Sequence, residues 1–209
     1  MADRFFDFLC GFLVFALCAM NGCAASAPEK LHAQVTLSAD CEPVGDYRLY
    51  SSRGAQQASG QYENGQRYGQ WSFWDSHGTK IVELMYVRGL KQGAYQMWYG
   101  SFAFPSSAGR KKEEGNFELD LLDGTKRSWF QGGEGRCDTK LRSGTIVGAQ
   151  CWTEDGQALP GEDALIAAHS ELEADMKYLR TLDEVVQDSV SDLCRERRDT
   201  SSMSAAPRE

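Results

Sequence analysis

Four cysteines in the body of the chain offer the clearest side-chain chemistry of this sequence: Cys41, Cys137, Cys151 and Cys194. No two of them show the Cys-x-x-Cys spacing typical of zinc sites, so we expect disulfide bonds and no bound metal. Four thiols allow three connectivities. We favour Cys137–Cys151, because this pair would lie on adjacent strands, together with Cys41–Cys194, which would join the start of the fold to its C-terminal helix.

Residues that could catalyse a reaction are few and widely spaced. The three histidines, His32, His77 and His169, have no spacing that would let two of them share a metal or activate a nucleophile. Acidic pairs such as Asp120 and Asp123 lie in predicted turns, where Asp is favoured for backbone reasons. We therefore expect no catalytic residues, no cofactor and no enzymatic activity.

The N-terminal segment has the features of a signal peptide. Residues 8–20 are uncharged and mostly apolar, which suits a signal-peptide core and is too short to span a bilayer. Small residues follow Cys23, as in the lipobox of bacterial lipoproteins, although Met20 and Asn21 depart from the usual residues there. We expect lipidation at Cys23. Secretion after cleavage behind Ala25 and an uncleaved anchor are the alternatives.

A 24-residue repeat organises the aromatic and glycine residues of the central region. The first copy contains Tyr62, Gly65, Gly69, Trp71 and Trp74, and the second contains Tyr86, Gly89, Gly93, Tyr95 and Trp98. Weaker copies contain Tyr50 and Gly54, then Phe117, Gly124, Trp129 and Phe130, and finally Leu141, Gly144, Gly148, Trp152 and Gly156. A fixed period of this length indicates a repeat architecture.

Each repeat is predicted to form a β-hairpin. Two runs suited to strands flank a turn in each unit, and Asn64-Gly65 is a favourable turn pair. Successive hairpins predict an antiparallel meander, because one hairpin alone is unstable in water. We expect Gly89 and Gly93 to let aromatic rings of neighbouring units lie over bare backbone. Core packing is the favoured role of the aromatic residues, and a ligand-stacking platform is the alternative.

The repeat resembles the bacterial variant of the MORN repeat. Residues 62–74 read YENGQRYGQWSFW, and the resemblance extends over residues 46–159, most clearly in two units. It implies a single-layer, twisted antiparallel sheet that serves as a scaffold or binding surface and has no catalytic residues. This variant is found in antitoxin-like proteins and in bacterial surface lipoproteins.

An insertion between the second and third clear repeats is a possible binding loop. It covers residues 100–112 and interrupts an otherwise regular meander. Its apolar and basic residues are Phe102, Phe104, Arg110, Lys111 and Lys112. Insertions in repeat proteins often lie on the binding face. A tolerated surface loop is the alternative.

The C-terminal region changes to helical spacing. Leucine or valine recurs every seven residues at Leu165, Leu172, Leu179, Val186 and Leu193. One long helix or two shorter ones covering the sheet is the favoured interpretation, and a coiled coil is the alternative. The predicted fold is mainly β with a C-terminal α segment. Its parts are a signal peptide (1–23), a tether (24–40), the repeat sheet (41–159), the helical segment (160–198) and a disordered tail (199–209).

Charge and address together predict a binding protein. The formal net charge of −8 argues against nucleic acid as a partner, because phosphate binding needs a basic surface. We expect a non-enzymatic, lipid-anchored scaffold or binding module of the bacterial cell envelope, at the outer membrane or periplasmic face, with an envelope protein as partner. The alternatives are an antitoxin or immunity protein that neutralises a toxin, a carbohydrate-binding module, and a secreted or periplasmic location.

Overall fold

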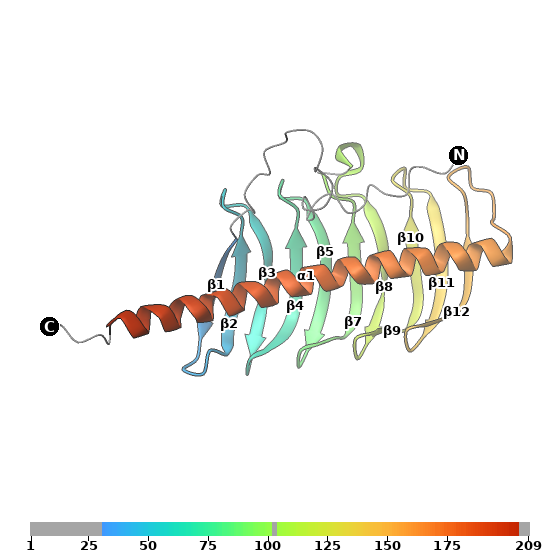
Figure 1. Cartoon of the computed structure of the whole chain (residues 1–209). Helices are drawn as coiled ribbons and strands as arrows, with labels where there is room; N and C mark the ends of the chain where they lie inside the picture. Colours follow the sequence, from blue (N-terminus) through green and yellow to red (C-terminus); the bar gives the residue numbers. More distant parts are fainter. Residues whose placement is uncertain (1–30, 102–103, 205–209) are drawn as a thin grey trace, which may run out of the picture.

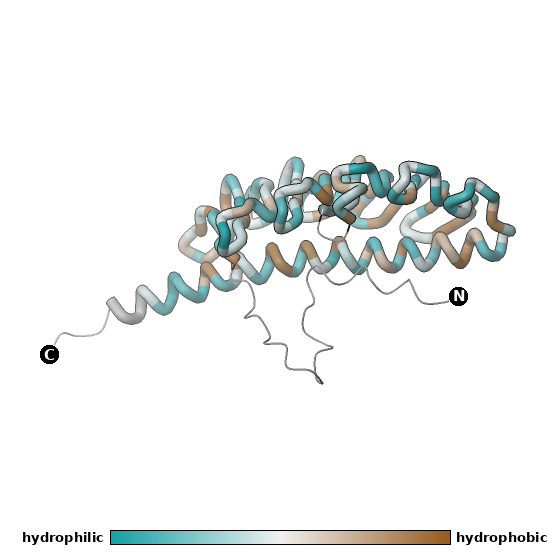
Figure 2. Tube along the Cα trace, turned by 90° about the horizontal axis from the view of Figure 1, so that it is seen from above, coloured by the Kyte–Doolittle hydropathy of each residue, from teal (hydrophilic) through white to brown (hydrophobic). Residues whose placement is uncertain are grey.

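The computed structural model describes residues 31–101 and 104–204, which form two layers (Figure 1). One layer is a single antiparallel β-sheet, and the other is one long helix, α1 (Gly161–Ser204), that crosses the strands on one face. Seen from above, the helix runs along the whole sheet (Figure 2). The predicted fold class, a β-meander covered by a C-terminal helix, is confirmed.

The sheet follows the order of the chain. Its main path contains β1 (His32–Leu37), β2 (Pro43–Tyr50), β3 (Gln56–Glu63), β4 (Gln66–Trp74), β5 (Lys80–Val87), β7 (Gly93–Trp98), β8 (Lys111–Glu118), β10 (Gly124–Trp129), β11 (Gly135–Arg142) and β12 (Thr145–Cys151). Two short strands, β6 (Leu90–Lys91) and β9 (Leu121–Leu122), pair beside β5 and β8, and the 3-10 helix η2 (Pro105–Ser107) lies in the insertion. Each strand pairs with the next, so the repeats form a meander.

The repeated glycines sit in equivalent turns. Asn64 and Gly65 have φ angles of 50° and 74°, and Arg88 and Gly89, 24 residues later, have 52° and 80°. Positive φ at both central residues is the hairpin-turn geometry that matches the twist of the flanking strands. The Asn-Gly pair was therefore a reliable turn signal, and the second copy adopts the same backbone without the asparagine.

The glycines beneath aromatic rings are not the ones expected. Gly93 has open space where a Cβ would stand, and Gly89 has only the Gln66 side chain nearby. The rings instead lie over two strand glycines: a Cβ on Gly60 would be 2.1 Å from Cδ2 of Trp71, and one on Gly115 would be 2.7 Å from Cε1 of Tyr95. The expectation for Gly89 and Gly93 was wrong because those residues are needed for positive φ.

Aromatic side chains form the core beneath the C-terminal half of α1. The indole of Trp71 is fully buried and stacks on Tyr47 with ring centres 5.2 Å apart. Tyr62 and Tyr86 contact the same indole edge-on, at 5.3 and 5.9 Å. These rings pack with the buried helix residues Leu179, Leu182, Val186 and Val190 in one apolar cluster. Burial of this cluster is the main apolar contribution to holding the helix on the sheet.

The buried stripe of α1 departs from the seven-residue pattern. Its positions are three or four residues apart throughout: Ala164, Ala168, Glu171, Asp175, Leu179, Leu182, Val186, Val190 and Cys194. A strict seven-residue repeat drifts around a straight helix by about 20° per heptad. Leu165, at one end of the predicted pattern, is therefore 41% exposed. The pattern predicted a helix correctly, but it did not predict which side faces the sheet.

Two of the expected boundaries were wrong. The tether predicted for residues 24–40 contains β1 (His32–Leu37), whose half-buried alternate residues pack against the core. The tail predicted from residue 199 begins inside α1, which continues to Ser204. A helix of 44 residues is about 66 Å long, whereas ten strands span only about 43 Å. The helix therefore extends beyond β1 (Figure 1).

Both predicted disulfides are present. Cys137 and Cys151 face each other in register on β11 and β12, and Cys41 is bonded to Cys194 near the far end of the sheet. The second bond joins the residues just before β2 to the last buried position of α1. It keeps the helix in place over the N-terminal strands.

Replacing Gly60 with alanine should destabilise the protein, because the added methyl group would overlap the Trp71 ring. Overpacking of this kind costs about 1–3 kcal/mol. The matched control is Gly148→Ala on β12, where a Cβ meets no atom within 4 Å, and its effect should stay within about 0.5 kcal/mol. Urea unfolding of the two variants measures the difference, and equal midpoints would contradict this packing.

The two disulfides should contribute unequally to stability. By chain entropy, the bond between Cys41 and Cys194, 153 residues apart, contributes about 5 kcal/mol and the bond across 14 residues about 3 kcal/mol. Serine replacement of each pair, followed by denaturant unfolding, compares them. Hydrogen exchange should speed up in the last turns of α1 only for the Cys41/Cys194 pair. A larger loss for the Cys137/Cys151 pair would refute this ranking.

Candidate functional site

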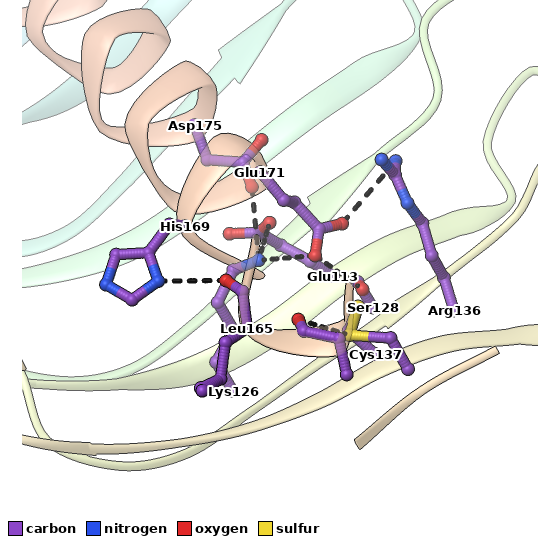
Figure 3. The surroundings of a disulfide bond; sticks show 11 residues. Glu113, Lys126, Ser128, Arg136, Cys137, Leu165, His169, Glu171 and Asp175 are labelled. Atoms are coloured by element: carbon purple, nitrogen blue, oxygen red, sulfur yellow. Dashed lines mark hydrogen bonds and ion pairs between the residues drawn. A yellow bond between two sulfur atoms is a disulfide. The ribbon is translucent and has the colours of Figure 1, made fainter. Parts of the chain in front are cut away.

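A carboxylate–lysine cluster joins α1 to the middle of the sheet (Figure 3). It contains Glu113 on β8, Lys126 on β10, Glu171 and Asp175 on α1, and Lys112. The Lys126 ammonium lies 3.1 Å from a Glu113 oxygen, 3.3 Å from a Glu171 oxygen and 3.1 Å from an Asp175 oxygen. The Lys112 ammonium lies 2.5 Å from the other Asp175 oxygen. All five residues are buried.

Further donors surround this cluster. The Tyr95 hydroxyl donates to Glu113 Oε1 at 2.6 Å, and the Ser128 hydroxyl donates to Glu171 Oε2 at 3.0 Å. The Arg136 guanidinium lies 3.6 Å from Glu171 Oε1 at the edge of the cluster. Buried carboxylates of this kind are stable only when cations and hydrogen-bond donors compensate them.

The cluster separates the pKa values of its carboxyl groups. Burial and repulsion by Asp175, opposed by Lys126, raise the pKa of Glu113 to about 8. Burial acts to raise the pKa of Asp175 as well, but Lys112, Glu113 and Lys126 outweigh it and hold that pKa well below its usual range. At neutral pH Glu113 is thus largely protonated, and Glu171 and Asp175 face two lysine charges.

The three carboxylates come close enough together to suggest a metal site, since one oxygen from each lies within 4.8 Å of the others. The Lys126 ammonium, however, already lies within 3.3 Å of an oxygen from each of them. It thus occupies the place that a cation would take. Side chains this deeply buried are also out of reach of a substrate. We assign the cluster to holding the helix on the sheet.

A second polar contact joins α1 to β4 and β5. The Asp183 carboxylate pairs with Arg67, accepts from the Tyr86 hydroxyl at 2.5 Å and pairs with Lys91 at 2.5 Å. The Arg67 guanidinium also lies 5.0 Å from the Trp71 ring centre. Burial acts to raise the pKa of Asp183, but Arg67 and Lys91 lower it below its ordinary value. This contact also holds the helix on the sheet.

The insertion is only partly a surface loop. Phe102 lies outside the described residues, Phe104 packs edge-on against Tyr99 at 5.3 Å, and exposed Arg110 donates to the carbonyl groups of Gln131 and Gly132. Lys111 and Lys112 belong to β8. The prediction that Lys112 is a binding residue was wrong, because a bulge opposite β7 turns it towards the helix, where it pairs with Asp175.

The sheet face opposite α1 carries a continuous polar row. Strand register places one such residue on each strand of the main path, from Gln34 through Arg48, Ser59, Ser72, Glu83, Gln96, Glu114, Arg127 and Asp138 to Gln150. Side chains alternate between the faces of a strand. Glu83, for example, lies between buried Val82 and Leu84 and so points away from the helix.

An aromatic–lysine row runs beside the polar row on this open face. Tyr50, Trp74, Trp98 and Trp129 end β2, β4, β7 and β10, and each is half-buried. The Lys80 ammonium lies 5.9 Å from the Trp74 ring centre and 6.0 Å from that of Trp98, and Lys111 lies 5.7 Å from that of Trp129. The repeat therefore divides its aromatic residues between the core and the open face.

The two rows are linked by ion pairs. Lys80 pairs with Glu83 at 2.6 Å, and Lys111 pairs with Glu114 at 2.7 Å. Both pairs are about one-third exposed, so their polar atoms remain accessible to a partner. The open face, defined as the aromatic–lysine row and the polar row together, is the candidate binding site.

The three histidines lie apart, as the sequence suggested. His32 is on β1, His77 is in the turn after β4, and His169 is exposed on α1, where its Nδ1 lies 2.8 Å from the Leu165 carbonyl oxygen (Figure 3). Among residues 31–101 and 104–204, no helix is both long and apolar enough to cross a membrane.

Sequence reasoning missed the carboxylate–lysine cluster. One signal was available: Lys126 occupies the repeat position that holds Trp71 and Tyr95 in the clearer copies. A lysine at a core position requires buried acidic partners, and Glu171 and Asp175 provide them from α1. Without the helix register, these partners could not be chosen among the many acidic residues of the C-terminal segment.

Comparisons with known proteins identify no relative. No family model matches the chain, and no curated protein matches it. A crystal structure of TarM is similar to 58% of this chain, with 10% sequence identity and a TM-score of 0.21. The chain spans only 20% of the length of that protein. The resemblance to the MORN repeat therefore stays a prediction from the sequence.

The raised pKa of Glu113 predicts a pH dependence of stability. Between its unfolded value of about 4.5 and its folded value of about 8, the folded state binds more protons than the unfolded state. The contribution of Glu113 is therefore full below pH 4.5 and is lost as the pH rises towards 8. The slope is at most about 1.4 kcal/mol per pH unit.

Glu113→Gln should flatten the stability profile between pH 5 and pH 8, because the amide can accept from Tyr95 but does not titrate. Denaturant unfolding of both proteins at several pH values measures the two slopes. Parallel profiles would show that Glu113 does not titrate in this range. Exposed Glu118→Gln, on the same strand, is the control.

Proposed function

We propose that this chain is a non-enzymatic binding or scaffold module, exported and held at the bacterial cell envelope by a lipid on Cys23. The two disulfides are the main support for export, because such bonds form and persist in oxidising compartments. Cys23 itself and the rest of the predicted signal peptide lie outside the described residues.

The use of polar side chains within the fold supports a binding role over an enzymatic one. The ionisable groups with the most strongly shifted pKa values, such as Glu113, Asp175 and Lys126, are buried and compensated within the chain. Perturbed groups at an active site normally line a cleft that substrate can enter. Here they hold the helix against the sheet, which leaves the open face to meet partners.

The predicted MORN-like repeat supports the same role. In this interpretation the repeats build an extended scaffold, and the helix covers one face so that the other stays free. An antitoxin or immunity role remains a proposal that the family resemblance alone suggests.

The address can be tested by labelling expressing bacteria with radioactive palmitate. We expect the full chain to incorporate the label and Cys23→Ser to lose it, because the lipid is attached to this thiol. Cys18→Ser, in the same leader, is the matched control and should keep the label. A labelled Cys23→Ser protein, or an unlabelled wild-type protein recovered in the soluble fraction, would contradict a lipid anchor at Cys23.

A further inference from the structure

We propose that the open face binds an extended, uncharged β-1,4-linked glycan that lies across the strands along the aromatic–lysine row. This inference rests on the proposed function as an exported binding module, and it names the ligand. The lipid address and glycan binding are separate properties, so either can fail without the other.

The spacing of the aromatic residues suits such a chain. Tyr50, Trp74, Trp98 and Trp129 lie on every second strand of the main path. Neighbouring strands are about 4.8 Å apart, so consecutive aromatic positions are about 10 Å apart. In an extended β-1,4-linked chain each sugar is turned over relative to the last, so every second sugar presents the same face. Two sugars cover a similar length, and the ligand can therefore meet the aromatic residues in phase.

The chemistry of the two rows suits sugar hydroxyls and C–H faces. Indole rings provide apolar surface with a polar N–H group at the edge. Lys80 and Lys111 provide donors beside the rings, and Glu83 and Glu114 provide acceptors. Gln96, between these two carboxylates in the polar row, offers both. A sugar lying on Trp98 would thus have donors and acceptors on both sides.

The charge pattern favours an uncharged ligand. Lys80 and Lys111 are each paired with a glutamate, and Arg127 lies between Glu114 and Asp138. These alternating charges nearly cancel along the open face. An anionic polymer would meet Glu83, Glu114 and Asp138 along its whole length, and the apolar face of another protein would have to cover the polar row unpaired.

Isothermal titration of the full chain provides the test, in a zwitterionic detergent because alkyl glycosides would compete. Cellohexaose and chitohexaose are the two probes, and the tighter one identifies the sugar. Maltohexaose, with α-linked glucose, controls for chain geometry and should not bind. A hexasaccharide should bind at least about tenfold more tightly than the matching disaccharide, because it reaches more than one aromatic position.

Trp98→Ala should weaken hexasaccharide binding by about tenfold or more, since it removes the ring at the centre of the row. Trp98→Phe keeps a ring and should retain most of the affinity. Tyr68→Ala is the matched control: Tyr68 is 46% exposed and lies on β4 outside both rows, so its loss should leave binding unchanged. Circular dichroism confirms that each variant remains folded.

Several results would overturn the proposal. These are no heat of binding with either hexasaccharide, equal affinity for maltohexaose, equal affinity for disaccharide and hexasaccharide, or an unchanged affinity in folded Trp98→Ala. If Trp98→Ala instead abolished a dimer seen by sedimentation while no sugar bound, the open face would be an interface between copies of the chain. None of these results would bear on the lipid at Cys23, which palmitate labelling tests separately.

Discussion

The structure depends on one constraint: a single helix must cover one face of a ten-strand sheet that has no second layer of its own. A single-layer sheet leaves its apolar face in water unless something packs on it. Here α1 crosses every strand of the main path, so each hairpin buries its inward side chains against a different turn of the same helix. The repeats share one core only through this element.

Polar contacts then place the helix at one position along the sheet. Apolar packing alone would tolerate a shift of one turn, whereas buried charges would not, because a shift would leave them unpaired. Asp175 lies against Lys112 and Lys126, Asp183 lies against Arg67, and the Tyr47 hydroxyl lies 2.7 Å from that of Ser189. We infer that these contacts contribute more to a unique register than to stability.

Covering one face leaves the other to function. Bulges near one end of several strands let outward residues form rows that run straight across the sheet. Because the repeat places an aromatic residue on every second strand, the open face acquires a regular spacing as a consequence of its construction. A surface of this kind suits a ligand that is itself extended and periodic.

The sequence by itself determined the meander, its turns, both disulfides and the presence of a C-terminal helix, because strand periodicity, positive-φ turns and cysteine spacing are local or nearly local signals. Only the tertiary structure decided which residues face the helix. Lys112 turned inward at a bulge, Lys126 found its partners 45 and 49 residues away at Glu171 and Asp175, and Leu165 turned outward. These outcomes depend on how one long helix lies across ten strands, and no local pattern contains that register.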